Sequence, residues 1–162
     1  MVAEPESSTE NPAAAEVAAA AAAAAKLSPE EQQKLNTALY EAAGDGKLEE
    51  AKAAVNAGAD VSSKHFESTT PLHPAAGRGH LSVVKLLVLH KTDLDAQSAA
   101  SGGDGGRTPL MYASMWGQID VINELLRAGA NKNIKANSGM TALDWTGKYR
   151  AENRDAIIAA LS

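Results

Sequence analysis

The sequence TPLHPAAGRGHLSVVKLLV, residues 70–88, sets the architecture of this 162-residue chain. It has the features of two short helices joined by a tight turn. Thr70 can cap the first helix with its hydroxyl, and Pro71 suits the first helical position because an amide there has no intrahelical partner. Gly79 ends this helix by adopting the left-handed conformation that a Cβ penalises. The stretch therefore predicts a helix–turn–helix unit.

The second helix of this unit has more apolar surface than one partner helix can cover. Leu81, Val84 and Leu87 recur at helical spacing. Val83 and Leu86 widen the apolar stripe. We therefore expect further helices to stack on this unit.

The rest of the chain contains copies of the same pattern. TPLMYASMWGQIDVINELL at 108–126 repeats it, and a weaker copy begins with TALDW at Thr141. The step from Thr108 to Thr141 is 141 − 108 = 33 residues, and the same step back from Leu72 reaches Leu39. The chain is therefore a tandem array of similar units.

These motifs closely resemble the ankyrin-repeat family, whose period is about 33 residues and whose signature is T-P-L-H-x-A. TPLHPAAGRGH at 70–80 matches the signature, and AGAD at 57–60 and AGAN at 128–131 match the turn after the second helix. The resemblance extends over 35–161. It implies an all-α solenoid of about four stacked helix–turn–helix units with short β-hairpin-like loops between them.

We predict two parts along the chain. An Ala-rich tail, disordered or a fluctuating helix, occupies 1–27, because short alanine helices are marginal in water. An ankyrin-repeat domain follows at 28–162, with these repeats: an N-terminal cap (28–61), an interior repeat (62–96), an interior repeat with a Gly-rich insertion (97–136) and a C-terminal cap (137–162).

Sharp helix boundaries are predicted in the first of these repeats. Ser28 and Glu31 form a capping box around Pro29, and Gly44 and Gly46 stop the helix. A second helix is expected over 48–56. The acidic start of the chain argues against a signal peptide, and its alanine run is too short and too weakly hydrophobic to cross a membrane.

Composition excludes several functional classes. The chain has no cysteine, so disulfides and thiol catalysis are excluded. Its net charge is −5 with no basic stripe, which argues against nucleic acid as a ligand. We expect a protein in the cytoplasm or nucleus that is monomeric by itself and has no membrane contact.

Catalysis and metal binding also have no support in the sequence. The resemblance makes His73 and His80 structural, and His65 and His90 occur in a loop or at a helix end without an HExxH motif. The Gly-rich stretch 97–106 lacks the GxxxxGK[ST] pattern of a phosphate-binding loop. Three candidates for acid–base or nucleophilic chemistry lie in separate repeats: Glu41, Ser114 and Asp144. We predict a non-enzyme without cofactor or metal.

The resemblance implies a partner-binding surface on the concave face, formed by loop tips and first helices. Five of the six aromatic residues map there, and aromatic and Arg side chains dominate binding hot spots. The predicted partner-binding residues are Phe66, Arg78, Arg107, Tyr112, Met115, Trp116, Trp145 and Tyr149. For Trp145 and Tyr149 the alternative is that they fill space in the C-terminal cap.

The predicted function is a non-catalytic protein–protein interaction module, acting as an adaptor or regulator. A structural subunit or small inhibitor is the alternative, in which the acidic Ala-rich tail makes the main contact with the partner.

Overall fold

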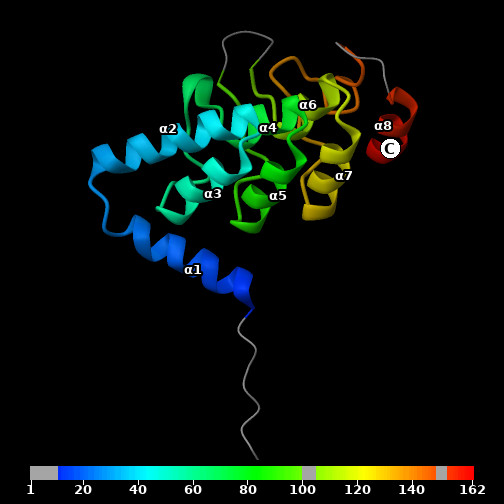
Figure 1. Ribbon diagram of the computed structural model, residues 1–162. Coiled ribbons are helices and arrows are strands. Elements are labelled where there is room, and N and C mark those ends of the chain that lie inside the picture. The colour runs from blue at the N-terminus through cyan, green and yellow to red at the C-terminus, as the bar shows by residue number, and fades with distance from the viewer. Residues whose placement is uncertain (1–10, 100–104, 149–152) are drawn as a thin grey trace, which may run out of the picture.

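The computed structural model describes residues 11–99, 105–148 and 153–162 (Figure 1). Within these ranges all regular structure is helical, and no strand occurs. The elements are α1 (Pro12–Ala24), α2 (Pro29–Asp45), α3 (Leu48–Asn56), the 3₁₀ turn η1 (Phe66–Ser68), α4 (Leu72–Arg78), α5 (Leu81–Leu89), α6 (Pro109–Met115), α7 (Ile119–Ala128) and α8 (Arg154–Leu161). The all-helical prediction is confirmed.

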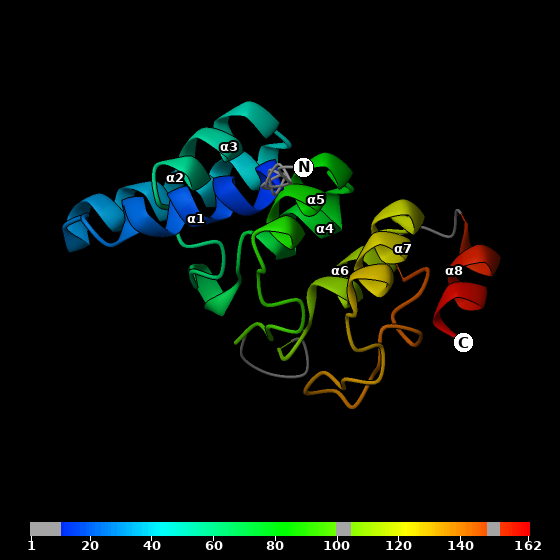
Figure 2. The same ribbon diagram turned by 90° about the horizontal axis from the view of Figure 1, so that it is seen from below.

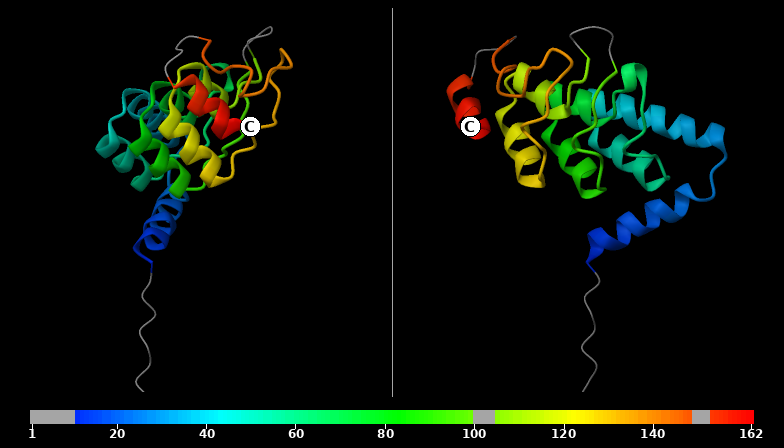
Figure 3. Two further views of the ribbon diagram at one scale, coloured as in Figure 1. Left: turned by 90° about the vertical axis from the view of Figure 1, so that its right-hand side faces the viewer. Right: turned by 180° about the vertical axis from the view of Figure 1, so that it is seen from behind.

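Three helix pairs stack side by side as two layers (Figures 1 and 3). Helices α2, α4 and α6 form one layer, and α3, α5 and α7 form the other. Helix α4 packs against both α2 and α6, and α5 packs against both α3 and α7. The stacked arrangement is the one that the surplus apolar surface of 81–89 predicts.

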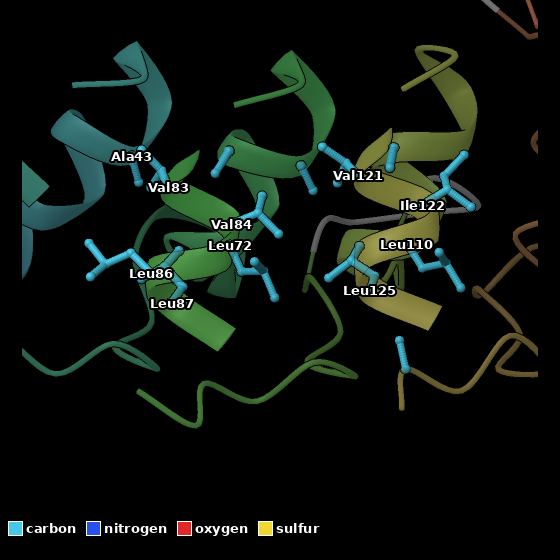
Figure 4. Close-up of a cluster of buried hydrophobic side chains, with 14 of the residues drawn as sticks. Ala43, Leu72, Val83, Val84, Leu86, Leu87, Leu110, Val121, Ile122 and Leu125 are labelled. Atoms are coloured by element: carbon cyan, nitrogen blue, oxygen red, sulfur yellow. The ribbon is translucent and has the colours of Figure 1, made fainter. Parts of the chain in front are cut away.

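The core runs continuously through the stack (Figure 4). In the middle pair, Leu72 of α4 and Val84 and Leu87 of α5 are fully buried. Ile122 and Leu125 of α7 are equally buried in the next pair. Each pair thus covers the apolar face that its neighbour exposes, and the stack buries one shared core.

Adjacent pairs are also joined at their helix–helix turns. His80 Nε2 lies 3.0 Å from the carbonyl of Gly44, and Gln118 Nε2 donates to the carbonyl of Gly77 at 3.3 Å. Gly79 has φ +81°, and a Cβ there would overlap the Gln118 side chain. The turn therefore favours glycine for its left-handed backbone angle, and a larger residue there would also displace the Gln118 side chain.

We predicted that the threonine of each Thr-Pro-Leu sequence caps a helix with its hydroxyl. This cap forms in the repeat that begins at Thr108 and not in the one that begins at Thr70. Thr108 accepts from the amide of Met111 at 3.4 Å, as predicted for a threonine N-cap. In the preceding repeat the hydroxyl of Thr70 instead lies 3.0 Å from Nδ1 of His73. The prediction for Thr70 was wrong: its hydroxyl pairs with the His73 ring, and α4 begins without a side-chain cap.

The N-terminal part contains two consecutive helices, α1 and α2. The capping box at Ser28 is present: its hydroxyl accepts from the Glu31 amide at 3.3 Å and its amide donates to the Glu31 carboxylate at 2.9 Å. Before it, α1 packs against α3 and buries Ala20. Residues 12–24 therefore form a helix that contacts the repeats, and the first ten residues of the predicted tail lie outside the described ranges.

The C-terminal repeat is irregular. Residues 142–147 form consecutive turns where the other repeats have a helix, and α8 then packs against α7. Trp145 is the largest fully buried side chain of the described residues. The weak TALDW copy thus retains the position of a first helix without its regular geometry.

The Gly-rich insertion is closed at its base. The amide of Ser98 donates to the carbonyl of Arg107 at 3.0 Å, and the amide of Gly106 donates to the carbonyl of Ser98 at 2.8 Å. These paired bonds make the hairpin-like base that was predicted for the loops. Residues 100–104 themselves lie outside the described ranges.

Candidate partner-binding face

An open groove lies where α4 and α6 end side by side. Its volume is about 500 Å³. Six residues line it: Pro74, Gly77, Arg78, Tyr112, Trp116 and Gln118. Because α4 and α6 belong to adjacent repeats, the groove crosses the boundary between two repeats.

Two aromatic rings form one wall of this groove. Trp116, at the end of α6, is 41% exposed, whereas Tyr112 is half-buried and meets the His73 ring edge-on at 5.3 Å. A Cβ on Gly77 would lie 3.4 Å from Tyr112 and 3.5 Å from Trp116, so the bare backbone of Gly77 fits against both rings. Burial raises the pKa of Tyr112, so its phenol stays protonated at neutral pH.

Arg78 forms the opposite wall and is partly engaged within the fold. Its guanidinium donates to the carbonyl of Gly44 at 2.5 Å and lies 3.6 Å from the carboxylate of Asp45. The side chain is nevertheless 61% exposed. Arg78 thus ties α4 to the end of α2 and still presents N–H donors to solvent.

Phe66 stands on the loop before α4. It is 82% exposed, and the two residues after it, Glu67 and Ser68, both have φ +54°, which is uncommon without glycine. Tyr40 holds this loop: its ring stacks on His65 at 4.4 Å and its hydroxyl lies 2.9 Å from that of Thr69. A held loop that presents a phenylalanine to solvent is suited to contacting a partner.

Three of the predicted partner-binding residues are buried. Met115 is 3% exposed, Trp145 is 1% exposed and Arg107 is 9% exposed. The Arg107 guanidinium lies 4.4 Å from the centre of the Trp145 ring, and the Lys148 ammonium lies 4.3 Å from it. We therefore remove these three from the candidate site, because their side chains are used in packing. Tyr149 lies outside the described residues.

His73 is structural, as the sequence predicted for this position. The amide of Thr70 donates to Nδ1 at 3.0 Å, and Nε2 lies 3.1 Å from the carbonyl of Arg107 in the next repeat. Burial lowers the pKa of His73 to about 4, so the ring is neutral at pH 7. Within the described ranges, no three His, Asp or Glu side chains cluster in a way that could hold a metal ion.

Sequence reasoning missed two residues of this face. Gln118 lines the groove and follows the turn glycine, as His80 does one repeat earlier. Because the equivalent His80 was assigned a structural role, the repeat pattern did not select Gln118. Tyr40 was missed because its partners, His65 and Thr69, come from the following loop.

The stacked helix pairs and their linking turns define a helical solenoid. A family model of ankyrin repeats in three copies matches residues 13–98 and 39–136. The chain belongs to the ankyrin-repeat family. Proteins of this family generally mediate protein–protein interactions and are typically non-catalytic.

Several curated proteins are similar to parts of the chain. Ankyrin repeat and SAM domain-containing protein 6 of Mus musculus is 38% identical over 78 residues, which are 48% of this chain and 8% of that protein. Alpha-latrotoxin-Lh1a of Latrodectus hasselti is 40% identical over 80 residues, 49% of this chain and 6% of the toxin. Neurogenic locus notch homolog protein 1 of Danio rerio is 31% identical over 126 residues, 77% of this chain and 5% of that protein. The chain thus covers only a small fraction of each relative.

No helix within the described ranges is both long and apolar enough to cross a membrane.

Proposed function

We propose that this protein is a non-catalytic interaction module that binds one partner protein through the groove between α4 and α6. Trp116 and Tyr112 supply apolar area, and Arg78 supplies donors to a carbonyl or carboxylate of the partner. Phe66 adds a separate contact from its loop. The proposal includes a monomeric protein that acts as an adaptor or regulator in the cytoplasm or nucleus, without nucleic acid as a ligand.

The observation that carries this proposal is the exposure of Trp116 beside the half-buried Tyr112 over a 500 Å³ groove. A tryptophan at 41% exposure leaves a large apolar surface in water, and burial against a partner recovers about 25 cal/mol per Å² of it. The neighbouring ring, held by His73, gives that partner a preformed wall. Preformed walls lower the ordering cost of binding.

Alanine substitution tests the groove. We expect Trp116→Ala and Tyr112→Ala to lower partner recovery in affinity purification from cell lysate at least tenfold, since hot-spot residues contribute about 2 kcal/mol or more. Leu143→Ala is the matched control, because Leu143 is 38% exposed and does not line the groove. Unchanged recovery by both aromatic variants, with the fold intact by circular dichroism, would exclude this face as the binding site.

A further inference from the structure

Helix α1 covers the surface opposite the loops, where α3 and α5 end (Figures 1 and 2). Among its described residues only Ala20 is buried. Val17, Ala23 and Ala24 are half-buried. Buried apolar area contributes about 25 cal/mol per Å², so a helix that contacts the repeats mostly through alanine methyls gains little from docking. The position of α1 nonetheless shows that this surface accepts a helix.

The surface is shaped for the close approach of a helix backbone. Gly58 has φ +102°, and a Cβ there would lie 2.6 Å from the amide nitrogen of Ala24 in α1. Gly129 occupies the same place in a later AGA turn and has φ +100°, but nothing lies within 4 Å of its Cβ position. The backbone angle is common to both turns, and only the turn at Gly58 contacts a helix.

The fit of α1 on this surface is incomplete. An open-sided cavity of about 310 Å³ remains between the helix and the repeats. Its apolar lining comes from both sides: Val17, Ala20, Ala21 and Ala24 of α1, and Val55, Ala59 and Val61 of the repeats. Side chains larger than alanine on the helix would cover more of this apolar lining and remove it from water.

His90 adds a polar group to the same cavity. It replaces the alanine that precedes the turn position in the equivalent segments, Ala57 and Ala128. His90 is 9% exposed, and among the described residues its Nε2 is buried without a hydrogen-bond partner. A buried polar atom without a partner is costly, and it marks the place where a bound molecule should supply a hydrogen bond.

We propose that α1 is an exchangeable cover on a helix-binding groove, whose occupant in the bound state is an amphipathic helix of a partner protein. The partner helix bears Leu, Ile or Met where α1 has alanine, which fills the cavity. A Ser or Thr hydroxyl on that helix bonds to His90. This surface is separate from the groove between α4 and α6, so either site can fail its test without affecting the other.

Docking of α1 is tested first, by hydrogen–deuterium exchange of the full chain. We expect Gly58→Ala to reduce the protection of α1 amides about tenfold, because the new Cβ meets the helix backbone. Gly129→Ala is the matched control: it carries the same backbone strain and has no neighbour to meet. Equal α1 protection in the two variants would overturn the proposal.

The replacement of α1 by another helix is tested with a helical peptide as the probe. The peptide copies residues 11–27 with Ala21→Leu and Ala24→Leu and carries fluorescein for anisotropy. We expect it to bind the full-chain Ala20→Arg variant, whose α1 cannot dock, at least tenfold more tightly than the Ala19→Arg control, whose substitution lies on the exposed face. We also expect it to bind at least tenfold more tightly than the unsubstituted peptide.

Two outcomes would overturn the proposal at this step. The first is equal affinity for the two arginine variants, or for the two peptides. The second is a dimer of the unmodified protein in sedimentation velocity whose α1 is exchanged between copies, because the occupant of the groove would then be a second copy of this chain. We expect a monomer.

Discussion

The Thr70–His73 turn in the middle of the array and the Thr141–Asp144 turn at its C-terminal end occupy equivalent places. In the first, the Thr70 amide donates to the His73 ring at 3.0 Å. In the second, the Thr141 amide donates to the Asp144 carboxylate at 2.8 Å, and the Thr141 hydroxyl donates to the same oxygen at 2.9 Å. An imidazole and a carboxylate close the same backbone turn.

The two turns differ in what the side chain does beyond its own repeat. His73 is fully buried, and its second nitrogen reaches the carbonyl of Arg107, 34 residues later. Asp144 is exposed, and its described hydrogen bonds remain within its own turn. The comparison indicates that local closure of the turn accepts either residue, whereas the second nitrogen of histidine adds a hydrogen bond to the next repeat.

Arg107 connects the two regions. Its backbone carbonyl lies 3.1 Å from Nε2 of His73, and its guanidinium lies over the Trp145 ring at 4.4 Å. The interior turn is therefore linked to its neighbour by a hydrogen bond, and the terminal turn by a cation–π contact and the burial of a large ring.

The largest expected effect comes from removing the buried ring of the terminal repeat. Trp145→Ala should lower the free energy of unfolding by about 4 kcal/mol, as for other buried tryptophans. Urea denaturation followed by circular dichroism measures the loss. Hydrogen exchange should show it concentrated in 141–148, with α4 and α5 still protected. Equal deprotection of α4 would mean that the two turns are not independent.

The two turns should lose their contributions to the free energy of unfolding at different acidic pH values. The pKa of His73 is lowered to about 4, so the unfolded chain takes up a proton first and stability falls as the pH drops from about 6.5 to about 4. Complete protonation of His73 should lower the free energy of unfolding by about 3 kcal/mol. The Thr141 hydrogen bonds hold the pKa of Asp144 below its usual value, so its contribution is lost only at still lower pH.

Urea midpoints at pH 7.0, 5.5 and 4.5 measure this acid effect. His65 and His90 also have pKa values lowered by burial and add to the same trend. His73→Gln is therefore the control. Glutamine does not titrate, so this variant should lose only the share of the pH dependence that is due to His73. A pH profile of this variant parallel to that of the unmodified protein would contradict the prediction.

Arg107→Met tests the link between the turns. The backbone bond to His73 remains, while the cation over Trp145 is replaced by a shorter, uncharged apolar chain. We expect a loss of about 1–2 kcal/mol, measured by urea denaturation. The exchange rate of the Thr70 amide should stay unchanged. Faster exchange at Thr70 would show that the guanidinium also supports the interior turn.

The smallest effect is expected for Asp144→Ala, at about 1 kcal/mol, since an exposed capping carboxylate contributes about that much. Thermal unfolding followed by circular dichroism measures the change. Asp144→Asn retains an acceptor for the Thr141 amide and should recover part of the loss. A cost as large as that of Trp145→Ala would mean that the carboxylate has a partner beyond its turn.

Much of the fold follows from the sequence because its determinants are local. The capping box at Ser28, the left-handed Gly79 and the helix 48–56 each depend on residues within a few positions. The docking of α1 could not be predicted in this way. It depends on the bare backbone of Gly58, which is 34 residues from Ala24, and the helix propensity of alanine carries no information about that contact.

The candidate site was less predictable for a similar reason. Met115 and Trp116 are adjacent at the end of α6, yet the first is buried and the second is exposed. Neighbouring side chains on a helix point about 100° apart. The sequence pattern does not show which of two adjacent residues at a helix end faces the core. The burial of Trp145 depends on Arg107, from the preceding repeat.

The closed base of the Gly-rich insertion makes it a suitable place for grafting. Ser98 exchanges hydrogen bonds with Gly106 and Arg107, and the Gln97 side chain donates to the Gly106 carbonyl at 2.8 Å. The chain therefore leaves and rejoins the array at nearly the same point. The cost of closing a longer loop grows only logarithmically with its length. A guest domain with adjacent termini, such as a fluorescent reporter, would join there without altering the helix stack.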